Sequence, residues 1–203
     1  MFHGRRTIKI CAVVFALFSV SFSVFSVAEK TFYDRELSFV REVFNFHVVS
    51  PNIMRASQPS AGAIRLLKKY CGIKTVLSLR DEKGRNKKEE KYLKKLGIKF
   101  INVPMNPLKE QSIETIEKCL QIISDKSNQP ILVHCREGKD RTGLIFAAYR
   151  MKYDNWSLED AVMEMLVYGY NRPLFFNLER SLLKWNDWRK KHSAEIEKAL
   201  TGK

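Results

Sequence analysis

A short apolar run, Ile131 to Val133, leads directly into the segment HCREGKDRTG and from there into a second apolar stretch. Such a pattern predicts a buried strand, a loop that bends at its glycines, and a helix that follows at once. In this arrangement the backbone N–H groups of the loop and of the first helical turn point at one place, which binds anions. The segment therefore restricts the chain to folds in which a strand, an anion-binding loop and a helix are consecutive.

Strand and helix signals alternate along most of the remaining chain. Several of the expected strands are apolar along their whole length, as in a sheet that is covered on both faces. We therefore expect an α/β fold with a central, mainly parallel sheet of four to five strands flanked by helices, and the anion-binding loop between a strand and a helix. The predicted strands are 46–49, 53–56, 75–79, 98–103 and 130–133, and the predicted helices are 59–71, 87–96, 112–123, 142–153, 157–168 and 176–200.

The first 28 residues differ from the rest of the chain. Basic residues precede an apolar run from Ile10 to Ala28 that carries no charge, and small residues end it. This pattern predicts a secretory signal peptide; an uncleaved membrane anchor is the alternative, because the run is about long enough to cross a bilayer. We expect residues 1–28 to export the protein to the periplasm or the cell exterior, or to anchor it in a membrane, and residues 29–203 to form one domain.

The chain of 203 residues has a formal net charge of +14, which favours an anionic substrate or partner. Few aromatic residues lie among the basic ones, so we do not expect nucleic-acid binding. The lysines of residues 87–95 predict a solvated helix face, because Glu89 and Glu90 lie among them; an anionic membrane surface is the alternative. The four histidines form no cluster, so we expect neither a metal nor another cofactor.

The residue types of the loop point to phosphoryl transfer. Gly138 permits a tight turn, and the guanidinium of Arg141 can bind two phosphate oxygens at once. The same positive charges and N–H groups stabilise a thiolate at Cys135, which is then a nucleophile directed at phosphorus. Thr142 can donate its hydroxyl to the sulfur as it leaves, and we expect His134 to orient the loop. The expected chemistry is phosphoryl transfer to sulfur, followed by hydrolysis.

HCREGKDRTG resembles the HCxxGxxR[S/T]G signature of the cysteine-dependent protein tyrosine phosphatase superfamily at every fixed position. The stretch MRASQPSAGAIRLLKKYCGIKTVLSLRDE is similar to the compact dual-specificity-like branch, and the resemblance extends over residues 49–188. It implies a dual-specificity-phosphatase-like domain at 29–203, with Cys135 as nucleophile and Arg141 as phosphate clamp. The residues expected to bind the substrate phosphate are Arg136, Glu137, Gly138, Lys139, Asp140, Arg141 and Thr142.

The chain departs from this family pattern at the general acid. The family places an aspartate on a loop about thirty residues before the cysteine, where it protonates the leaving oxygen. The corresponding stretch here is VPMNPLKE, and Asn106 stands where the acid is expected. Two carboxyl groups are candidates: Asp140 within the loop, as in the myotubularin-like enzymes, and Glu110. We expect Asp140 to be the acid.

Lys139 adds a second positive charge beside the loop, which favours a phospholipid or an inositol phosphate as substrate. A phosphoprotein, phosphorylated on tyrosine, serine or threonine, is the other substrate class considered. A catalytically weak module that binds phosphorylated ligands is the alternative function. Arg55 and Gln58 either approach the phosphate or hold a turn. Cys71 and Cys119 are the thiols that could pair with Cys135 on oxidation.

Overall fold

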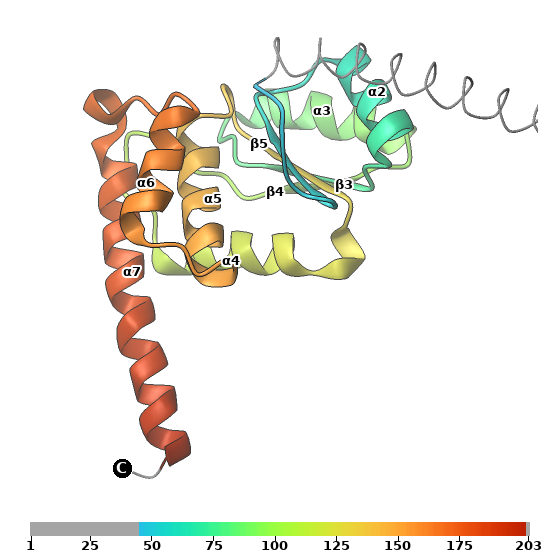
Figure 1. Ribbon diagram of the computed structural model, residues 1–203. Coiled ribbons are helices and arrows are strands. Elements are labelled where there is room, and N and C mark those ends of the chain that lie inside the picture. The colour runs from blue at the N-terminus through green and yellow to red at the C-terminus, as the bar shows by residue number, and fades with distance from the viewer. Residues whose placement is uncertain (1–44, 202–203) are drawn as a thin grey trace, which may run out of the picture. The chain divides into compact units, whose positions relative to one another are not determined.

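The computed structural model describes residues 45–201, and the side chains up to residue 193 (Figure 1). The expected signal or anchor segment at residues 1–28 lies outside the described residues, so export stays a prediction. Within the described part of the chain, no helix is both long and apolar enough to cross a membrane.

The centre of the fold is a five-stranded sheet in the order β1-β2-β5-β3-β4. β1 runs antiparallel to β2, and every other neighbouring pair is parallel. The prediction of an α/β fold with a mainly parallel sheet is therefore confirmed. The strands are β1 (His47–Ser50), β2 (Ile53–Ala56), β3 (Thr75–Ser78), β4 (Lys99–Asn102) and β5 (Ile131–His134).

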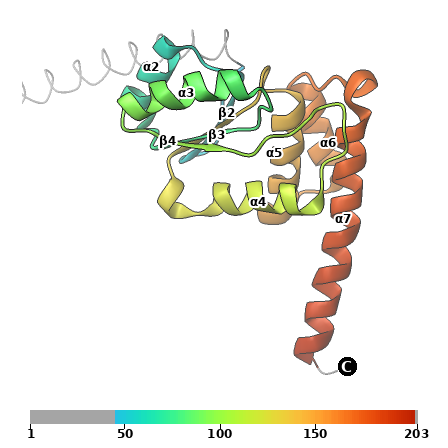
Figure 2. The ribbon, with the colours of Figure 1, turned by 180° about the vertical axis from the view of Figure 1, so that it is seen from behind.

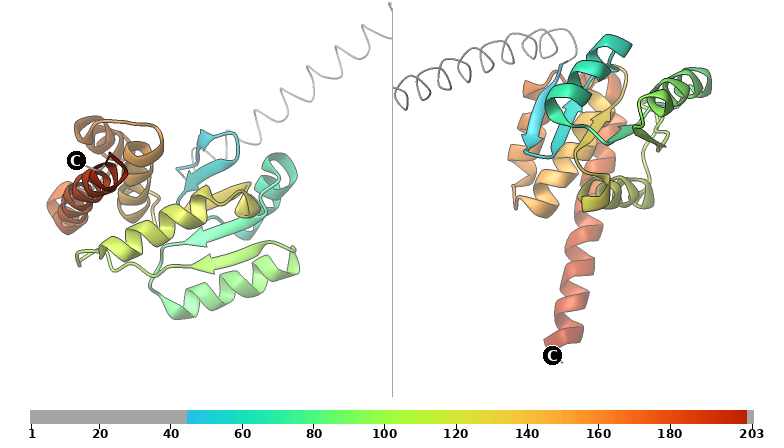
Figure 3. Two further views of the ribbon diagram at one scale, coloured as in Figure 1. Left: turned by 90° about the horizontal axis from the view of Figure 1, so that it is seen from below. Right: turned by 90° about the vertical axis from the view of Figure 1, so that its right-hand side faces the viewer.

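Helices cover both faces of the sheet. α2 and α3 lie on one face, and α4 and α5 lie on the other (Figures 1 and 2). α6 and α7 pack beside α5, so that these three helices form a group (Figures 1 and 3). The helices are α2 (Ala61–Cys71), α3 (Lys83–Lys95), α4 (Ile113–Ser124), η1 (Lys126–Asn128), α5 (Asp140–Tyr153), α6 (Leu158–Val167) and α7 (Arg172–Thr201).

Serine side chains start three of the helices. Ser60, Ser112 and Ser157 each accept a hydrogen bond from a backbone N–H in the first turn of the helix that follows. Such a bond satisfies one of the N–H groups that a helix start leaves without an intrahelical partner. At Ser157 the hydroxyl also donates a hydrogen bond to the Asp160 carboxylate.

The register of the sheet assigns neighbouring side chains to opposite faces. Arg55 on β2 is level with Val133 on β5, and the next row of the sheet contains His134. Because side chains alternate along a strand, these two rows face opposite sides. Arg55 therefore faces α5 and α6, whereas His134 faces α3. Both side chains lie at the carboxyl end of the sheet, directly beneath the loop that follows β5.

Three helices begin earlier than the sequence patterns predict. α3 starts at Lys83 rather than residue 87, because Asn86 is buried and donates a hydrogen bond to the carbonyl of Arg80. α7 starts at Arg172, with a break at Phe175, instead of at residue 176. α5 starts at Asp140 rather than at residue 142. The last shift affects function, since it places Asp140 and Arg141 in the first turn of α5.

Candidate active site

The loop between β5 and α5 curls around the sulfur of Cys135. The Cys135 side chain is buried, and the backbone N–H of Gly138 donates to its Sγ at 3.3 Å. Gly138 has a φ of 71°, and a Cβ at this position would lie 2.6 Å from the backbone of Ala56 on β2. No larger residue fits there without displacing the loop, so the prediction that Gly138 permits the tight turn is confirmed.

The sulfur lies in a cleft of about 360 Å³ at the carboxyl ends of β3, β4 and β5. In open parallel sheets this edge is the usual place for ligands. Five of the predicted site residues meet in this cleft, and they come from the loop and the first turn of α5. The lining residues are Cys135, Arg136, Glu137, Asp140 and Arg141, together with Asp81, Glu82, Asn106, Pro107, Leu108 and Phe175.

Two other predicted residues lie beside the cleft without lining it. Lys139 forms an ion pair with Glu137 at 3.6 Å, and its aliphatic chain packs over Gly169. The positive charge that the sequence places near the substrate is therefore partly neutralised. Thr142 is fully buried, and its Oγ1 makes no hydrogen bond within the described residues. This hydroxyl remains available for the sulfur or for a bound substrate.

Arg141 is held in the cleft by contacts from two other loops. Its Nη1 donates to Oδ1 of Asp81 at 3.0 Å and to the carbonyl of Met105 at 3.1 Å. These contacts fix the guanidinium at the carboxyl ends of β3 and β4. A bound phosphate competes with the Asp81 carboxylate for the same group. The sequence patterns did not assign this role to Asp81. In the sequence Asp81 follows Arg80, which suggests an ion pair between these two neighbours, but in the structure Arg80 pairs with Glu82.

The two candidate acids lie in different surroundings. Asp140 is buried at the edge of the cleft, accepts a hydrogen bond from the backbone N–H of Asn171 at 2.9 Å, and has its pKa raised by burial. Glu110 does not line the cleft; it forms ion pairs with Arg180 and Lys184, and the hydrogen bond from Lys184 lowers its pKa. Only Asp140 combines a place in the cleft with a pKa shift that favours the protonated form.

Asn106, at the position of the missing acid, shapes a turn. Its Oδ1 accepts a hydrogen bond from the backbone N–H of Leu108 at 2.9 Å. Its side chain thus closes an Asx-type turn that keeps Pro107 and Leu108 on the cleft wall. The amide therefore has a structural role in the loop where the family usually has its proton donor.

Arg55 supports the loop from the α5 side of the sheet. Its Nη2 donates to the carbonyl of Gly138 at 3.0 Å, and its Nη1 lies 3.8 Å from the Glu164 carboxylate. The guanidinium also lies 4.1 Å from the ring centroid of Tyr168 and 5.3 Å from that of Phe146. Burial lowers the pKa of Arg55 to about 10. Arg55 was expected either to approach the phosphate or to hold a turn; its hydrogen bond to the Gly138 carbonyl shows the second role.

Glu89 supports the loop from the α3 side. Its Oε1 accepts a hydrogen bond from Gln58 Nε2 at 2.8 Å and lies 3.0 Å from His134 Nε2. The backbone N–H of Gln58 donates to the carbonyl of Arg136 at 3.1 Å, and His134 Nδ1 lies 3.0 Å from the carbonyl of Cys135. The Glu89 carboxylate thus contacts two residues that hydrogen-bond neighbouring carbonyl groups of the loop, His134 through its ring and Gln58 through its backbone N–H.

The lysines of residues 87–95 are exposed, as the sequence predicts, but Glu89 is not part of this solvated face, because its side chain is only 9% exposed. The spacing of three and four residues from Asn86 to Glu89 and from there to Leu93 places all three on one helix face. Asn86 and Leu93 are both buried. This spacing is the sequence pattern that indicates burial of Glu89, but the many lysines around it make the helix look exposed on all sides.

We expect Glu89→Ala to lower kcat on an aryl phosphate roughly tenfold, because the loop carbonyls lose their support and the sulfur is placed less accurately. Glu89→Gln keeps an oxygen for Gln58, so its loss of kcat should be smaller. Glu90→Ala, on the exposed side of the same helix, is the matched control. Steady-state kinetics with a melting curve for each variant make the comparison; equal kcat values for the Glu89→Ala and Glu90→Ala variants would show that Glu89 has no positioning role.

The geometry agrees with comparisons to known proteins. The model of the tyrosine phosphatase family matches residues 40–186, which include the loop and all the elements around it. The chain belongs to the tyrosine phosphatase family. It is 27% identical over 127 residues to the dual specificity protein phosphatase TpbA of Pseudomonas aeruginosa, covering 62% of this chain and 55% of TpbA.

A second family member is more similar in sequence over a shorter stretch. The inositol diphosphatase SIW14 of Saccharomyces cerevisiae is 36% identical over 118 residues, covering 56% of this chain and 41% of SIW14. This chain thus spans about half the length of the curated relatives that it matches. The crystal structure of the SIW14 core catalytic domain superposes with a TM-score of 0.62 at 30% identity, over 75% of this chain and 92% of that domain.

Two further possibilities for this site are a disulfide to Cys135 and a bound metal ion. Cys119 lies in the core on α4, and burial raises the pKa of its thiol to about 12. Because only a thiolate exchanges with a disulfide, Cys119 is a poor partner for Cys135. Across residues 45–201, no group of three or more histidine, cysteine, aspartate or glutamate side chains is placed to hold a metal ion.

Proposed function

We propose that this member of the tyrosine phosphatase family hydrolyses phosphate monoesters through a phosphocysteine intermediate. The observation that carries the proposal is Cys135 Sγ at the floor of a cleft, facing the Gly138 N–H with the Arg141 guanidinium beside it. Sγ attacks phosphorus, the bond to the leaving oxygen breaks, and Asp140 gives that oxygen a proton. Water then attacks the phosphocysteine and releases inorganic phosphate and the Cys135 thiolate.

The names of the relatives support two substrate classes. SIW14 is an inositol diphosphatase, and TpbA is a dual specificity protein phosphatase. Inositol phosphates and phosphoproteins are therefore the classes that we propose for this chain. A phospholipid headgroup at an anionic membrane surface remains part of the proposal, since it presents the same phosphate monoester as a soluble inositol phosphate does.

A binding module without turnover is the second candidate function, and two observations favour it. The Arg141 guanidinium already donates a hydrogen bond to the Asp81 carboxylate, and Asn106 stands where the family has its general-acid aspartate. The purified full chain decides between the two candidates. We expect it to hydrolyse p-nitrophenyl phosphate at the same rate with and without EDTA. Binding of vanadate without any hydrolysis of aryl, inositol or lipid phosphates would contradict the enzyme proposal and support the module.

A further inference from the structure

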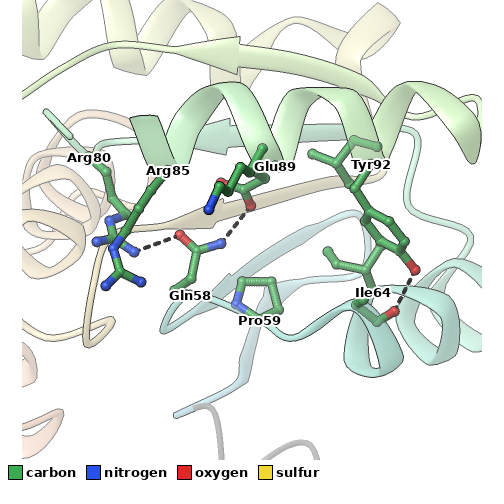
Figure 4. Close-up of a pocket in the computed structure, with 10 residues that line it drawn as sticks. Gln58, Pro59, Ile64, Arg80, Arg85, Glu89 and Tyr92 are labelled. Atoms are coloured by element: carbon green, nitrogen blue, oxygen red, sulfur yellow. Dashed lines mark hydrogen bonds between the residues drawn. The ribbon is translucent and has the colours of Figure 1, made fainter. Parts of the chain in front are cut away.

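A second hollow of about 260 Å³ lies between α2 and α3 (Figure 4). At the roughly 30 Å³ that a water molecule occupies in the liquid, this space accommodates a phosphate group with part of its hydration shell. Apolar side chains and one tyrosine, whose hydroxyl donates to the carbonyl of Ala61, form part of its wall. The lining residues are Gln58, Pro59, Ala61, Ile64, Arg80, Arg85, Lys88, Glu89, Tyr92 and Leu93.

This hollow adjoins the catalytic loop. Gln58 lines it and donates its backbone N–H to the carbonyl of Arg136, whose side chain lines the catalytic cleft. The segment after β3 separates the two spaces: Arg80 lines the hollow, whereas the next two residues, Asp81 and Glu82, line the cleft. A small ligand that binds at Cys135 therefore has the hollow as its immediate neighbour.

Two charged groups of the hollow are already used by the protein. The Arg80 guanidinium donates two hydrogen bonds to the Glu82 carboxylate and one to Oε1 of Gln58. Figure 4 shows Gln58 between Arg80 and Glu89, to which it also donates a hydrogen bond. Among the described residues that line the hollow, Glu89 has the one carboxylate; its Oε1 contacts Gln58 and His134, whereas its buried Oε2 has no hydrogen-bond partner.

Three positively charged side chains near Gln58 have no partner in the described part of the chain. The side chains of Arg85 and Lys88 in the hollow, and of Arg136 on the cleft side, make no hydrogen bond or ion pair within residues 45–193. Most arginines in the same part of the chain have a carboxylate partner, as Arg55, Arg80, Arg141, Arg150, Arg172 and Arg180 do. Unpaired cationic side chains on both sides of the segment that separates the hollow from the cleft are suited to binding the anionic groups of a ligand.

We propose that Arg85 and Lys88 form a second phosphate-binding subsite, which binds another phosphate group of a substrate whose scissile phosphate sits on the Cys135 loop. The substrate class is a compact molecule with at least two phosphate groups, either free in solution or as a lipid headgroup. The catalytic cleft has little further positive charge for a second phosphate group, since the Arg141 guanidinium is contacted by Asp81 and the Lys139 ammonium is paired with Glu137. The proposal rests on the proposed phosphatase function.

The test compares ligands with one and with several phosphate groups. Inorganic phosphate and inositol trisphosphate are used as inhibitors of p-nitrophenyl phosphate hydrolysis by the full chain, and calorimetry measures the binding of both ligands independently of turnover. We expect the double variant Arg85→Gln/Lys88→Gln to lose roughly tenfold in its preference for inositol trisphosphate over inorganic phosphate. Lys87→Gln/Lys91→Gln removes the same charge from exposed positions of α3 outside the hollow, and should keep the preference within about twofold.

Each outcome bears on a different statement. Equal losses of preference in the two double variants would overturn the subsite, because net charge alone would then explain the binding. Absence of p-nitrophenyl phosphate hydrolysis would overturn the proposed function, while calorimetry still tests the subsite. Vesicles that contain phosphatidylinositol bisphosphate form a further arm: a selective loss on vesicles alone identifies a lipid headgroup as the ligand, and a selective loss with inositol trisphosphate identifies a soluble one.

Discussion

Cys135→Ser is expected to reduce kcat for p-nitrophenyl phosphate by a factor on the order of 10⁴ or more, which is the scale on which removal of an enzyme nucleophile acts. A serine hydroxyl is not ionised near neutral pH, so the cleft loses its nucleophile although the side chain keeps nearly the same size. The N–H group of Gly138 and the guanidinium of Arg141 remain in place. Vanadate and inorganic phosphate should therefore still bind, and calorimetry on the variant measures this directly.

A variant of a different cysteine separates chemistry from general effects of thiol loss. Cys119 is buried on α4 and does not line the cleft. Cys119→Ala should keep kcat close to that of the unmodified chain, at a cost in melting temperature because it removes a buried side chain. If Cys135→Ser retained a tenth of the original turnover, a phosphocysteine intermediate could not be the main route.

The sequence predicts the catalytic loop well because its information is local. The apolar run before Cys135 specifies a buried strand, and the position of Gly138 requires the left-handed turn that the structure shows. The mainly parallel sheet follows from the alternation of strand and helix patterns. The start of α5 could not be predicted to the residue, because Asp140 is fixed by a hydrogen bond from Asn171, which lies 31 positions further along the chain.

The supporting residues could not be predicted from local patterns, since they depend on the register of the sheet. Arg55 and His134 lie in neighbouring rows, and only the pairing of β2 with β5 sends them to opposite faces. Glu89 lies 45 positions before His134 on a helix whose composition indicates solvent exposure. Asp81 reaches Arg141 because the carboxyl ends of β3 and β5 adjoin in the sheet. These contacts join segments that are far apart in the sequence.

The effect of Asp140→Asn should depend on the leaving group. Hydrolysis of an alkyl phosphate, whose poor leaving group needs a proton, should slow by roughly 10² to 10³, within the range for loss of a general acid. Hydrolysis of p-nitrophenyl phosphate should slow less than about tenfold, because nitrophenolate leaves without help. The asparagine keeps an oxygen that can accept from the Asn171 N–H, so the fold should be little affected. The ratio of the two kcat values is the measurement.

The pH dependence gives a second readout for the same variant. Burial raises the pKa of Asp140, so this carboxyl keeps its proton to a higher pH than an exposed aspartate does. A general acid works only while protonated; kcat for the alkyl phosphate should therefore fall as the pH rises through this raised pKa. The Asn variant should lose this part of the profile, since an amide does not titrate in that range.

Two other carboxyl groups make the assignment open to refutation. Glu110→Gln should leave the leaving-group ratio unchanged, because Glu110 is ion-paired with Arg180 and Lys184 outside the cleft. Asp81→Asn should also leave the ratio unchanged, since the Asp81 carboxylate accepts a hydrogen bond from the Arg141 guanidinium, a contact that an asparagine oxygen can also make. If either variant slowed the alkyl phosphate selectively while Asp140→Asn did not, the acid would be that residue. Asp140 would then be a support for the backbone of Asn171.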